Sequence, residues 1–568
     1  MLEQLKSLFS FGAGKLDPSN HKLKPVMLLI LDGWGVAPNS TGNVIAQAKT
    51  PNLDNYKLIY PHGELIASGE SVGLPANEVG NTEVGHLTLG AGRVILQGLK
   101  RINVAIEDGS FFQNKQFKAA IQHVKTNNSK LHLMGVITTG NVHASLPHFY
   151  ALLEMCKQFG LSNNVFAHAF TDGRDAPPKE GMTLLAEAQE KMNFLKVGKF
   201  ATISGRYYSM DRDRRWERIE KAYQALVEGK GPTATTFQEV LEKTYAKGLT
   251  DEQVEPTVLV ENNAPIATID DNDAVIYFNF RIDRPREFTM ALSLPDFESI
   301  KPLDFGYSEE RESKEAQKNH SQGTFKRGKV PKNLFVVTMM NYHKNIPVNG
   351  VAFNTDIIDK PMAEIVSGHN VQQMHMAESE KERFVTYYFD GYRESRFLGE
   401  DFDVVPSPRV QTYDRKPEMS TFQLVTSLRG NFQKDIYTFF VMNIAAPDMV
   451  AHTGNIPATI KACEATDKAV GEIVDMILTL QGTIMITADH GHAEELLSYP
   501  TASFFFTTVQ GNMSTDHTNN PVPFVIISQA LKGQASRVEQ GVLSDVAPTL
   551  LSLLGIPIPP EMTGQNLL

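Results

Sequence analysis

Apolar residues in this chain gather in short runs that end abruptly at polar clusters. Examples are Val26–Leu31, Leu131–Ile137, Val275–Phe280 and Ile484–Thr487, and each is followed within two positions by a polar side chain. Helical patterns separate these runs, which is typical of fully buried strands in an α/β protein. Open α/β sheets bind ligands at the carboxyl ends of their strands, so the polar clusters are candidate functional sites.

The length of the chain predicts more than one domain. At 568 residues it exceeds what a single hydrophobic core usually supports, so two domains of comparable size are expected. The stretch Tyr307–Lys329 is dense in charged and amide side chains, and is therefore predicted to be a surface loop near a domain boundary. Residues 1–21 lack the apolar core of a secretory signal and are expected to form an N-terminal extension.

Composition then excludes several classes of function. A net charge of -11 argues against a broad surface for nucleic acid or anionic membrane, so functional basic residues must be local. The longest apolar runs fall far short of the roughly 20 residues that a membrane helix needs. Only two cysteines, Cys156 and Cys463, leave no room for a disulfide framework or a thiolate metal cage. This cysteine usage favours a reducing cytoplasm.

Asp and His side chains recur in patterns that fit metal ligands. Asp448 and His452 are four residues apart, which places a carboxylate and an imidazole on one helical face, although a capping Asp and a surface His fit this spacing too. Asp489 to His492 and Asp32-Gly33 each follow a buried run, and Asp516 to Thr518 lies in a polar loop. Such oxygen and nitrogen donors suit manganese, zinc or similar ions acting on phosphate esters.

The segment Gly80 to His86 predicts a loop that enters a helix, with backbone amides able to face a phosphate. Thr82 supplies a hydroxyl at its centre. A hydroxyl is a poor nucleophile unless a metal or a base activates it, so a nearby metal site would make Thr82 a nucleophile. Without such a site, a helix-capping threonine is the simpler interpretation.

These motifs occur together with others in a characteristic order. The segments, in chain order, are Leu31 to Gly35, Gly80 to His86, Asp172 to Asp175, Ser204 to Tyr208 with Met210 to Arg212, Asn279 to Arg281 with Asp283 and Arg284, Glu378 to Lys381, Pro447 to His452, Ala488 to Gly491, and Glu561 to Gly564. In these segments the chain resembles the 2,3-bisphosphoglycerate-independent phosphoglycerate mutases of the alkaline phosphatase superfamily. The resemblance runs from about Lys24 to the C-terminus.

The resemblance implies an α/β fold with two α/β domains. An alkaline-phosphatase-like metal domain would consist of residues 22–97 and 333–568, with a phosphotransferase, substrate-binding domain inserted at residues 98–332. Hinges would lie near Gln97–Lys100 and Val330–Asn333, and the two domains would close to exclude water. The implied reaction is the interconversion of 3-phosphoglycerate and 2-phosphoglycerate in glycolysis and gluconeogenesis, without bisphosphoglycerate.

The resemblance also implies two divalent metal ions. Manganese is expected first, with zinc, cobalt or magnesium as alternatives. One site would use three side chains and the other four: Asp448, His452 and His517 for the first, and Asp32, Asp489, His490 and the Thr82 oxygen for the second.

A basic substrate pocket is implied as well, and it would consist of His143, Arg174, Asp175, Arg206, Arg212, Arg281, Arg284 and Lys381. Guanidinium forks bind phosphate and carboxylate groups in a bidentate manner, which suits a phosphoglycerate. The alternative for the arginines is surface ion pairing, and for His143 a structural role. The expected catalytic residues are the nucleophile Thr82, the proton carrier Asp175, and Lys381 with Arg284 on the phosphoryl group.

The chain departs from the family pattern at a few positions. Thr82 stands where the family normally has serine, Thr138 to Ser145 replaces S-D-G-G-V-H-S-H, and Asn77 to Val79 replaces a common G-Q-M. Two alternatives therefore stay open: a metal-dependent phosphatase or mutase for another small phosphoester, and a catalytically weakened phosphoglycerate-binding protein. We expect a monomer with a small-molecule substrate and no nucleic-acid or membrane partner.

Overall fold

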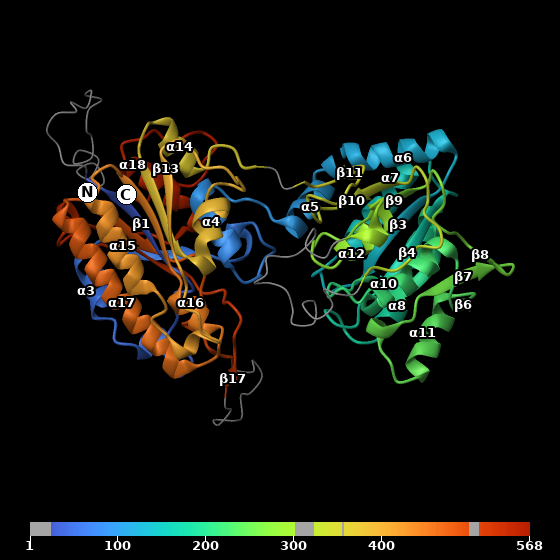
Figure 1. Ribbon diagram of the computed structural model, residues 1–568, viewed down its shortest axis with the longest axis horizontal. Coiled ribbons are helices and arrows are strands. Elements are labelled where there is room, and N and C mark those ends of the chain that lie inside the picture. Colours follow the sequence, from blue (N-terminus) through green and yellow to red (C-terminus); the bar gives the residue numbers. More distant parts are fainter. Residues whose placement is uncertain (1–23, 301–322, 355–356, 499–510) are drawn as a thin grey trace. The chain divides into compact units, whose positions relative to one another are not determined.

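The computed structural model describes residues 24–300, 323–354, 357–498 and 511–568. The chain divides into two compact units, Met1–Gln97 with Asp356–Leu568 and Gly98–Thr355, and each contains a sheet covered by helices (Figure 1). The predicted α/β class is confirmed. The predicted N-terminal extension, residues 1–21, and residues 307–322 of the predicted surface loop lie outside the described residues.

The first unit is built on a mixed eight-stranded sheet. Its strands, in spatial order, are β13 (Glu400–Val405), β12 (Gln373–Glu378), β14 (Phe439–Ile444), β1 (Val26–Leu31), β15 (Thr483–Thr487), β18 (Val522–Ser528), β2 (His62–Ile66) and β19 (Gly541–Val542). The strands from β13 to β15 are mutually parallel, whereas β18 runs antiparallel to both of its neighbours. Every residue of β1 is buried, as expected for a central strand covered on both faces.

Helices of the first unit form a layer on each face of this sheet (Figure 1). They are α2 (Val44–Gln47), α3 (Pro51–Ile59), α4 (Thr82–Ala91), α14 (Met362–Gly368), α15 (Thr421–Gln433), α16 (Ala446–Ala451), α17 (Ile456–Thr479) and α18 (Val546–Leu553). The long helix α17 packs against α3 and α15, and α4 packs against α14 and α18. A separate two-stranded antiparallel sheet consists of β16 (Leu497–Ser498) and β17 (Asn512–Met513).

The second unit has its own nine-stranded sheet. Its strands, in spatial order, are β11 (Gly350–Val351), β10 (Phe335–Thr338), β9 (Ala274–Tyr277), β3 (Leu131–Ile137), β4 (Val165–Thr171), β5 (Lys199–Gly205), β7 (Thr257–Glu261) and β6 (Thr233–Ala234), with β8 (Ala264–Pro265) on β7. The strands from β11 to β5 are parallel. Its helices are α5 (Gly98–Glu107), α6 (Lys115–Asn127), α7 (Leu146–Gln158), α8 (Gly181–Leu195), α9 (Arg206–Ser209), α10 (Trp216–Tyr223), α11 (Phe237–Ala246) and α12 (Arg286–Ser293).

Shorter helical turns connect these elements. In the first unit they are η1 (Gly69–Val72), η9 (Ser379–Lys381), η10 (Phe384–Tyr388), η11 (Tyr413–Arg415), η12 (Gln529–Leu531) and η13 (Leu543–Asp545). In the second unit they are η2 (Ser110–Gln113), η3 (Gln224–Glu228), η4 (Asp251–Gln253) and η5 (Phe297–Ser299). No helix in the described part of the chain combines the length and apolar character that a membrane crossing needs.

The second compact unit extends further along the chain than the inserted domain expected from the sequence. The chain enters the second unit after Gln97, but it returns at Thr355/Asp356 and not at residues 332/333. The reason is strand pairing, because β10 extends the second sheet by pairing with β9, and β11 pairs with β10 in turn. The predicted hinge Val330–Asn333 therefore lies inside the second unit.

The structure also differs from two local predictions, one for a strand and one for the surface loop. The apolar run Val275–Phe280 leaves the sheet at Tyr277, because the backbone amide of Phe280 donates instead to His143 O at 2.9 Å. Residues 323–329, the described end of the predicted surface loop, are partly packed inside the unit. Phe325 and Arg327 are buried, and Arg327 donates to the carbonyls of Ala291 at 3.1 Å and Leu294 at 3.0 Å.

Candidate active site

The carboxyl ends of adjacent parallel strands bring the predicted metal ligands of the first unit together. Asp32 follows β1, Asp489 and His490 follow β15, and Asp448 lies on α16 just after β14. Lys381 ends the short turn η9 that follows β12. Parallel strands end at one edge of a sheet, so segments far apart in sequence converge there.

Thr82 is the first residue of α4 and not its cap. The cap is Asn81, whose side chain accepts a hydrogen bond from the backbone amide of Val84 at 3.1 Å. The capping interpretation of Thr82 is therefore wrong, and its hydroxyl is free for other contacts. The Thr82 Oγ1 is buried and lies 3.0 Å from His490 Nε2 and 3.1 Å from Lys381 Nζ.

Three buried carboxylates surround the Lys381 ammonium. Its Nζ donates to Asp32 Oδ1 at 2.8 Å and to Asp448 Oδ2 at 2.7 Å. Burial alone lowers a lysine pKa, but these carboxylates outweigh burial and hold the pKa of Lys381 above its usual range. Burial, followed by the charge of Asp489, raises the pKa of Asp32 to about 7. One ammonium against the carboxylates of Asp32, Asp448 and Asp489 leaves excess negative charge, which a buried site must balance with cations or protons.

The predicted histidine ligands each turn one ring nitrogen toward these carboxylates. The Nδ1 atoms of His452, His517 and His490 lie 3.0, 3.0 and 3.3 Å from backbone carbonyl oxygens. A carbonyl only accepts, so each Nδ1 carries the proton and each Nε2 lone pair is left to bind a metal. Ligand atoms of Asp448, His452 and His517 lie within 4.8 Å of one another, as do those of Asp32, Asp448 and His490. This donor set fits divalent ions that accept oxygen and nitrogen ligands.

Several side chains outside the predicted ligand sets support this cluster. His86 Nδ1 lies 2.9 Å from Thr82 O and 3.3 Å from Asp489 Oδ2. Asn443 donates through Nδ2 to Asp32 Oδ2 at 2.7 Å. His492 Nδ1 lies 2.7 Å from Asp448 Oδ1.

The predicted substrate ligands other than Lys381 lie in the second unit, again at the carboxyl ends of adjacent parallel strands. Arg206 follows β5, and Arg174 and Asp175 follow β4. Arg206 Nη1 donates to Asp172 Oδ1 at 2.7 Å and to Asp175 Oδ2 at 2.5 Å. Burial alone would raise the pKa of Asp172, but the amide of Asp175 and the charge of Arg206 outweigh it and hold that pKa below its usual value.

Asp283 lies beside three further predicted ligands, Arg212, Arg281 and His143. Its carboxylate accepts from Arg212 Nη1 at 2.7 Å, pairs with Arg281 Nε at 3.2 Å, and lies 3.7 Å from His143 Nδ1. The other ring nitrogen of His143 lies 3.5 Å from Asp175 Oδ2. Burial, followed by the charge of Arg206, lowers the pKa of His143 to about 3, so the ring is neutral at physiological pH.

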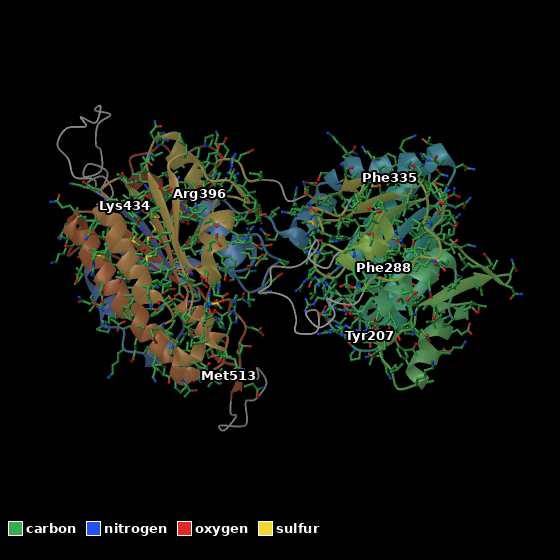
Figure 2. The ribbon with its side chains drawn as sticks, in the orientation of Figure 1. Tyr207, Phe288, Phe335, Arg396, Lys434 and Met513 are labelled. Carbon is green, nitrogen blue, oxygen red and sulfur yellow. The ribbon has the colours of Figure 1, made fainter. Side chains whose placement is uncertain are left out.

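A cavity of about 390 Å³ opens beside these arginines. Its charged lining consists of Arg174, Arg206, Arg212, Arg215, Arg218 and Arg284 with Asp211, Asp213 and Glu252. Arg215 and Arg218 lie outside the predicted set, and the guanidinium of Arg218 stacks 3.7 Å from the ring centroid of Tyr207, which Figure 2 labels. Burial, followed by the charge of Arg206, lowers the pKa of Arg284 to about 10.

Comparisons with known proteins show which proteins the chain is similar to. Residues 102–344 match the family model described as the N-terminus of BPG-independent PGAM. The chain is 44% identical over 545 residues to the 2,3-bisphosphoglycerate-independent phosphoglycerate mutase of Clostridium beijerinckii, covering 96% of this chain and 99% of the relative. It is 43% identical over 545 residues to that of Clostridium tetani, with the same coverage.

A solved structure is similar over nearly the whole length. Phosphoglycerate mutase of Leishmania mexicana, crystallised at low cobalt concentration, superposes with a TM-score of 0.62 at 27% sequence identity. The match covers 96% of this chain and 98% of that chain.

Proposed function

The chain belongs to the 2,3-bisphosphoglycerate-independent phosphoglycerate mutases, which interconvert 3-phosphoglycerate and 2-phosphoglycerate, and from this premise we propose that Thr82 carries the phosphoryl group between the two positions. The observation that supports this role is the environment of the Thr82 hydroxyl. It is buried at the start of α4, 3.0 Å from His490 Nε2 and 3.1 Å from Lys381 Nζ. A hydroxyl between a ring nitrogen and an ammonium suits an attacking oxygen that must first lose its proton.

Metal ions complete the proposed site. Asp448, His452 and His517 would hold one ion. Asp32, Asp489, His490 and the Thr82 oxygen would hold the other, because His490 Nε2 lies 3.5 Å from Asp32 Oδ1, 3.4 Å from Asp489 Oδ2 and 3.0 Å from Thr82 Oγ1. Manganese is the first candidate. Bound there, the ions would lower the pKa of the Thr82 hydroxyl and neutralise charge on the phosphoryl oxygens. The support is the excess of buried carboxylate and the Nε2 atoms that the backbone carbonyls leave facing it.

The second unit would bind the substrate. Six guanidinium groups and three carboxylates line its 390 Å³ cavity, so its lining is predominantly basic. A phosphoglycerate carries a phosphate dianion and a carboxylate, and both groups are ligands for guanidinium side chains. Guanidinium forks bind both groups with defined geometry, so Arg174, Arg206, Arg212, Arg281 and Arg284 suit this substrate better than a simple phosphate ester.

In the proposed reaction the Thr82 alkoxide forms a bond to phosphorus while the bond from phosphorus to the 3-oxygen of glycerate breaks. Asp175 gives a proton to that 3-oxygen, so free glycerate and phosphothreonine result. The glycerate then reorients without leaving, and its 2-oxygen attacks phosphorus as its proton passes back to Asp175. Lys381 and Arg284 would stabilise charge on the phosphoryl oxygens in both steps, and the Thr82 alkoxide is regenerated.

Water exclusion would separate this mutase from a phosphatase, because a phosphothreonine open to solvent hydrolyses. Incubation of the manganese-loaded protein with 3-phosphoglycerate alone, followed by product analysis, tests the proposal. We expect 2-phosphoglycerate from the wild type and from Thr82→Ser, and none from Thr82→Ala. Equal turnover in wild type and Thr82→Ala would refute the nucleophile, and glycerate with free phosphate as the main products would indicate a phosphatase.

A further inference from the structure

Glu494 is a buried carboxylate behind the metal cluster, and the proposed chemistry gives it no role. Its Oε2 accepts from the backbone amides of Gly35 at 3.0 Å and His492 at 2.7 Å. Its Oε1 accepts from the hydroxyl of Thr518 and from Asn520 Nδ2 at 3.1 Å. Hydrogen bonds to a carboxylate are stronger than those between neutral groups, so the Glu494 side chain is held firmly. We call Glu494 and its four hydrogen-bond donors the junction.

The donors to Glu494 come from three separate loops, and each loop carries proposed metal ligands. We call them the ligand loops: Asp32–Gly35 after β1, Asp489–His492 after β15, and Asp516–Asn520 before β18. The last two also pair directly, through a bridge in which the Thr518 amide donates to Gly491 O at 3.0 Å. One carboxylate therefore connects backbone or side-chain groups of all three ligand loops.

Two glycines leave the space that this junction occupies. A Cβ atom on Gly35 would lie 2.1 Å from Glu494 Cδ, and one on Gly491 would lie 2.4 Å from Glu494 Oε1. Both distances are shorter than real Cβ contacts allow, so any other residue there would push the carboxylate away. The ligand loops therefore fit closely around the Glu494 carboxylate.

The junction also reaches a proposed ligand through His492. Glu494 holds the His492 backbone amide, and the ring of His492 lies on the opposite side with Nδ1 2.7 Å from Asp448 Oδ1. Its Nδ1–H donating to that oxygen would fix the rotation of the Asp448 carboxylate.

We propose that Glu494 is a positioning residue that sets the spacing of the ligand loops and thereby the affinity of the site for its metal ions. This inference rests on the proposed metal sites. Groups that orient metal ligands typically contribute a factor of about 10 to 100 in metal affinity. In Glu494→Gln the side-chain NH2 group would face hydrogen-bond donors whichever way the amide is turned. About half of the hydrogen bonds of the junction would therefore be lost.

The test is manganese affinity of the purified full-length protein, measured by isothermal titration calorimetry after chelation. We expect Glu494→Gln to bind manganese about 10 to 100 times more weakly than wild type while its far-ultraviolet circular dichroism is unchanged. Glu539→Gln is the matched control, because this carboxylate is exposed and lies outside the ligand loops. The control should bind as wild type does.

A second variant keeps the test informative if Glu494→Gln does not fold. Thr518→Val removes one donor to the junction with little change in shape, and we expect a smaller loss of manganese affinity in the same direction. Wild-type affinity in the folded Glu494→Gln variant, or in Thr518→Val where the first does not fold, would overturn the inference. A wild-type protein that binds no manganese would instead overturn the proposed metal sites.

Discussion

Asp283 is a single carboxylate on which two proposed substrate arginines depend. It holds Arg212 at 2.7 Å and Arg281 at 3.2 Å, so its charge sets their separation. We predict that Asp283→Asn raises KM for 3-phosphoglycerate by about tenfold, equivalent to about 1.4 kcal/mol, and changes kcat less. Steady-state kinetics measures both, with the exposed Asp296→Asn as control. A fall in kcat at unchanged KM would place Asp283 in the chemical step.

Asp390 is a buried carboxyl that hydrogen-bonds a second buried carboxyl, Glu400. Burial, followed by the charge of Glu400, raises the pKa of Asp390 well above its usual value of 3.8. The folded state therefore keeps a proton that the unfolded chain releases. The stabilisation that this proton provides is complete below pH 3.8 and is lost as pH rises through the folded-state pKa.

An asparagine at position 390 keeps a hydrogen-bond donor toward Glu400 without a proton to lose. We predict that Asp390→Asn unfolds at higher denaturant concentration than wild type at pH 8, and that the difference shrinks toward pH 5. Urea unfolding of the metal-free protein across this pH range measures the difference. A difference that does not vary with pH would contradict the shared proton.

At this scale the sequence identified ligands better than the residues that orient them. Asp448 and His452 are recognisable because four residues span one helical turn. Asp283 and Glu494 are not, because their roles come from hydrogen bonds to groups far away in the chain. Glu494 and Gly35 lie 459 positions apart, and no local spacing encodes such a contact.

Four buried polar side chains link neighbouring elements across the sheet of the second unit. Thr202 on β5 lies 2.9 Å from His168 Nδ1 on β4, and His168 Nε2 lies 2.9 Å from His132 Nδ1 on β3. His132 Nε2 lies 3.0 Å from Asp273 Oδ2, just before β9. If each group donates to the next, from hydroxyl to carboxylate, both rings are neutral and every one of these contacts is a hydrogen bond.

This series of hydrogen bonds predicts how the stability of the second unit responds to acid. Burial lowers the pKa of His132 and, together with His132, lowers that of His168 well below 6.5. As pH falls below 6.5, the unfolded chain protonates both histidines and the folded state does not. The stabilisation of the folded state by the two neutral histidines is therefore complete above pH 6.5 and is lost as pH falls. Nitrogen-15 chemical shifts should show both rings as neutral Nε2–H tautomers at pH 6. Imidazolium shifts at that pH would refute the arrangement.

Removing the Thr202 hydroxyl, the first donor, tests the same series of hydrogen bonds through the stability of the protein. Thr202→Val keeps the side-chain shape but leaves His168 Nδ1 unpaired, so we predict a loss of about 1–3 kcal/mol in the free energy of unfolding. Thr233→Val, at an exposed position on β6, is the matched control and should change stability little. Equal effects of the two changes would mean that the buried hydroxyl contributes nothing specific.

Elements were predictable where their apolar runs were long. The run Leu131–Ile137 forms β3 without change, and Val26–Leu31 forms β1. The four-residue strand β10 was not predicted, because its assignment depends on pairing with β9 and not on its own pattern. Short strands at a sheet edge owe their place to non-local contacts, which a local pattern does not contain.

At the scale of the whole molecule, the proposed chemistry is divided between two units with separate hydrophobic cores. One core extends from Ile102 to Phe353 within the second unit, and another is formed by strands and helices of the first unit around β1. All proposed metal ligands belong to the first unit, and the arginine cavity belongs to the second. The proposed chemistry therefore assigns a different role to each unit.

This division predicts that metal and substrate stabilise different units. Manganese at a hundred times its dissociation constant should add about 2.7 kcal/mol to the stability of the first unit, and 3-phosphoglycerate alone should act on the second. Differential scanning calorimetry of the full chain should then show two transitions that respond separately. Asp448→Ala should weaken the manganese response only, because it removes a ligand of one of the two proposed sites, and Asp283→Asn should weaken the phosphoglycerate response only. If chelation lowers both transitions equally, the proposed ligands are not confined to one independently folding unit, and the assignment of the two roles fails.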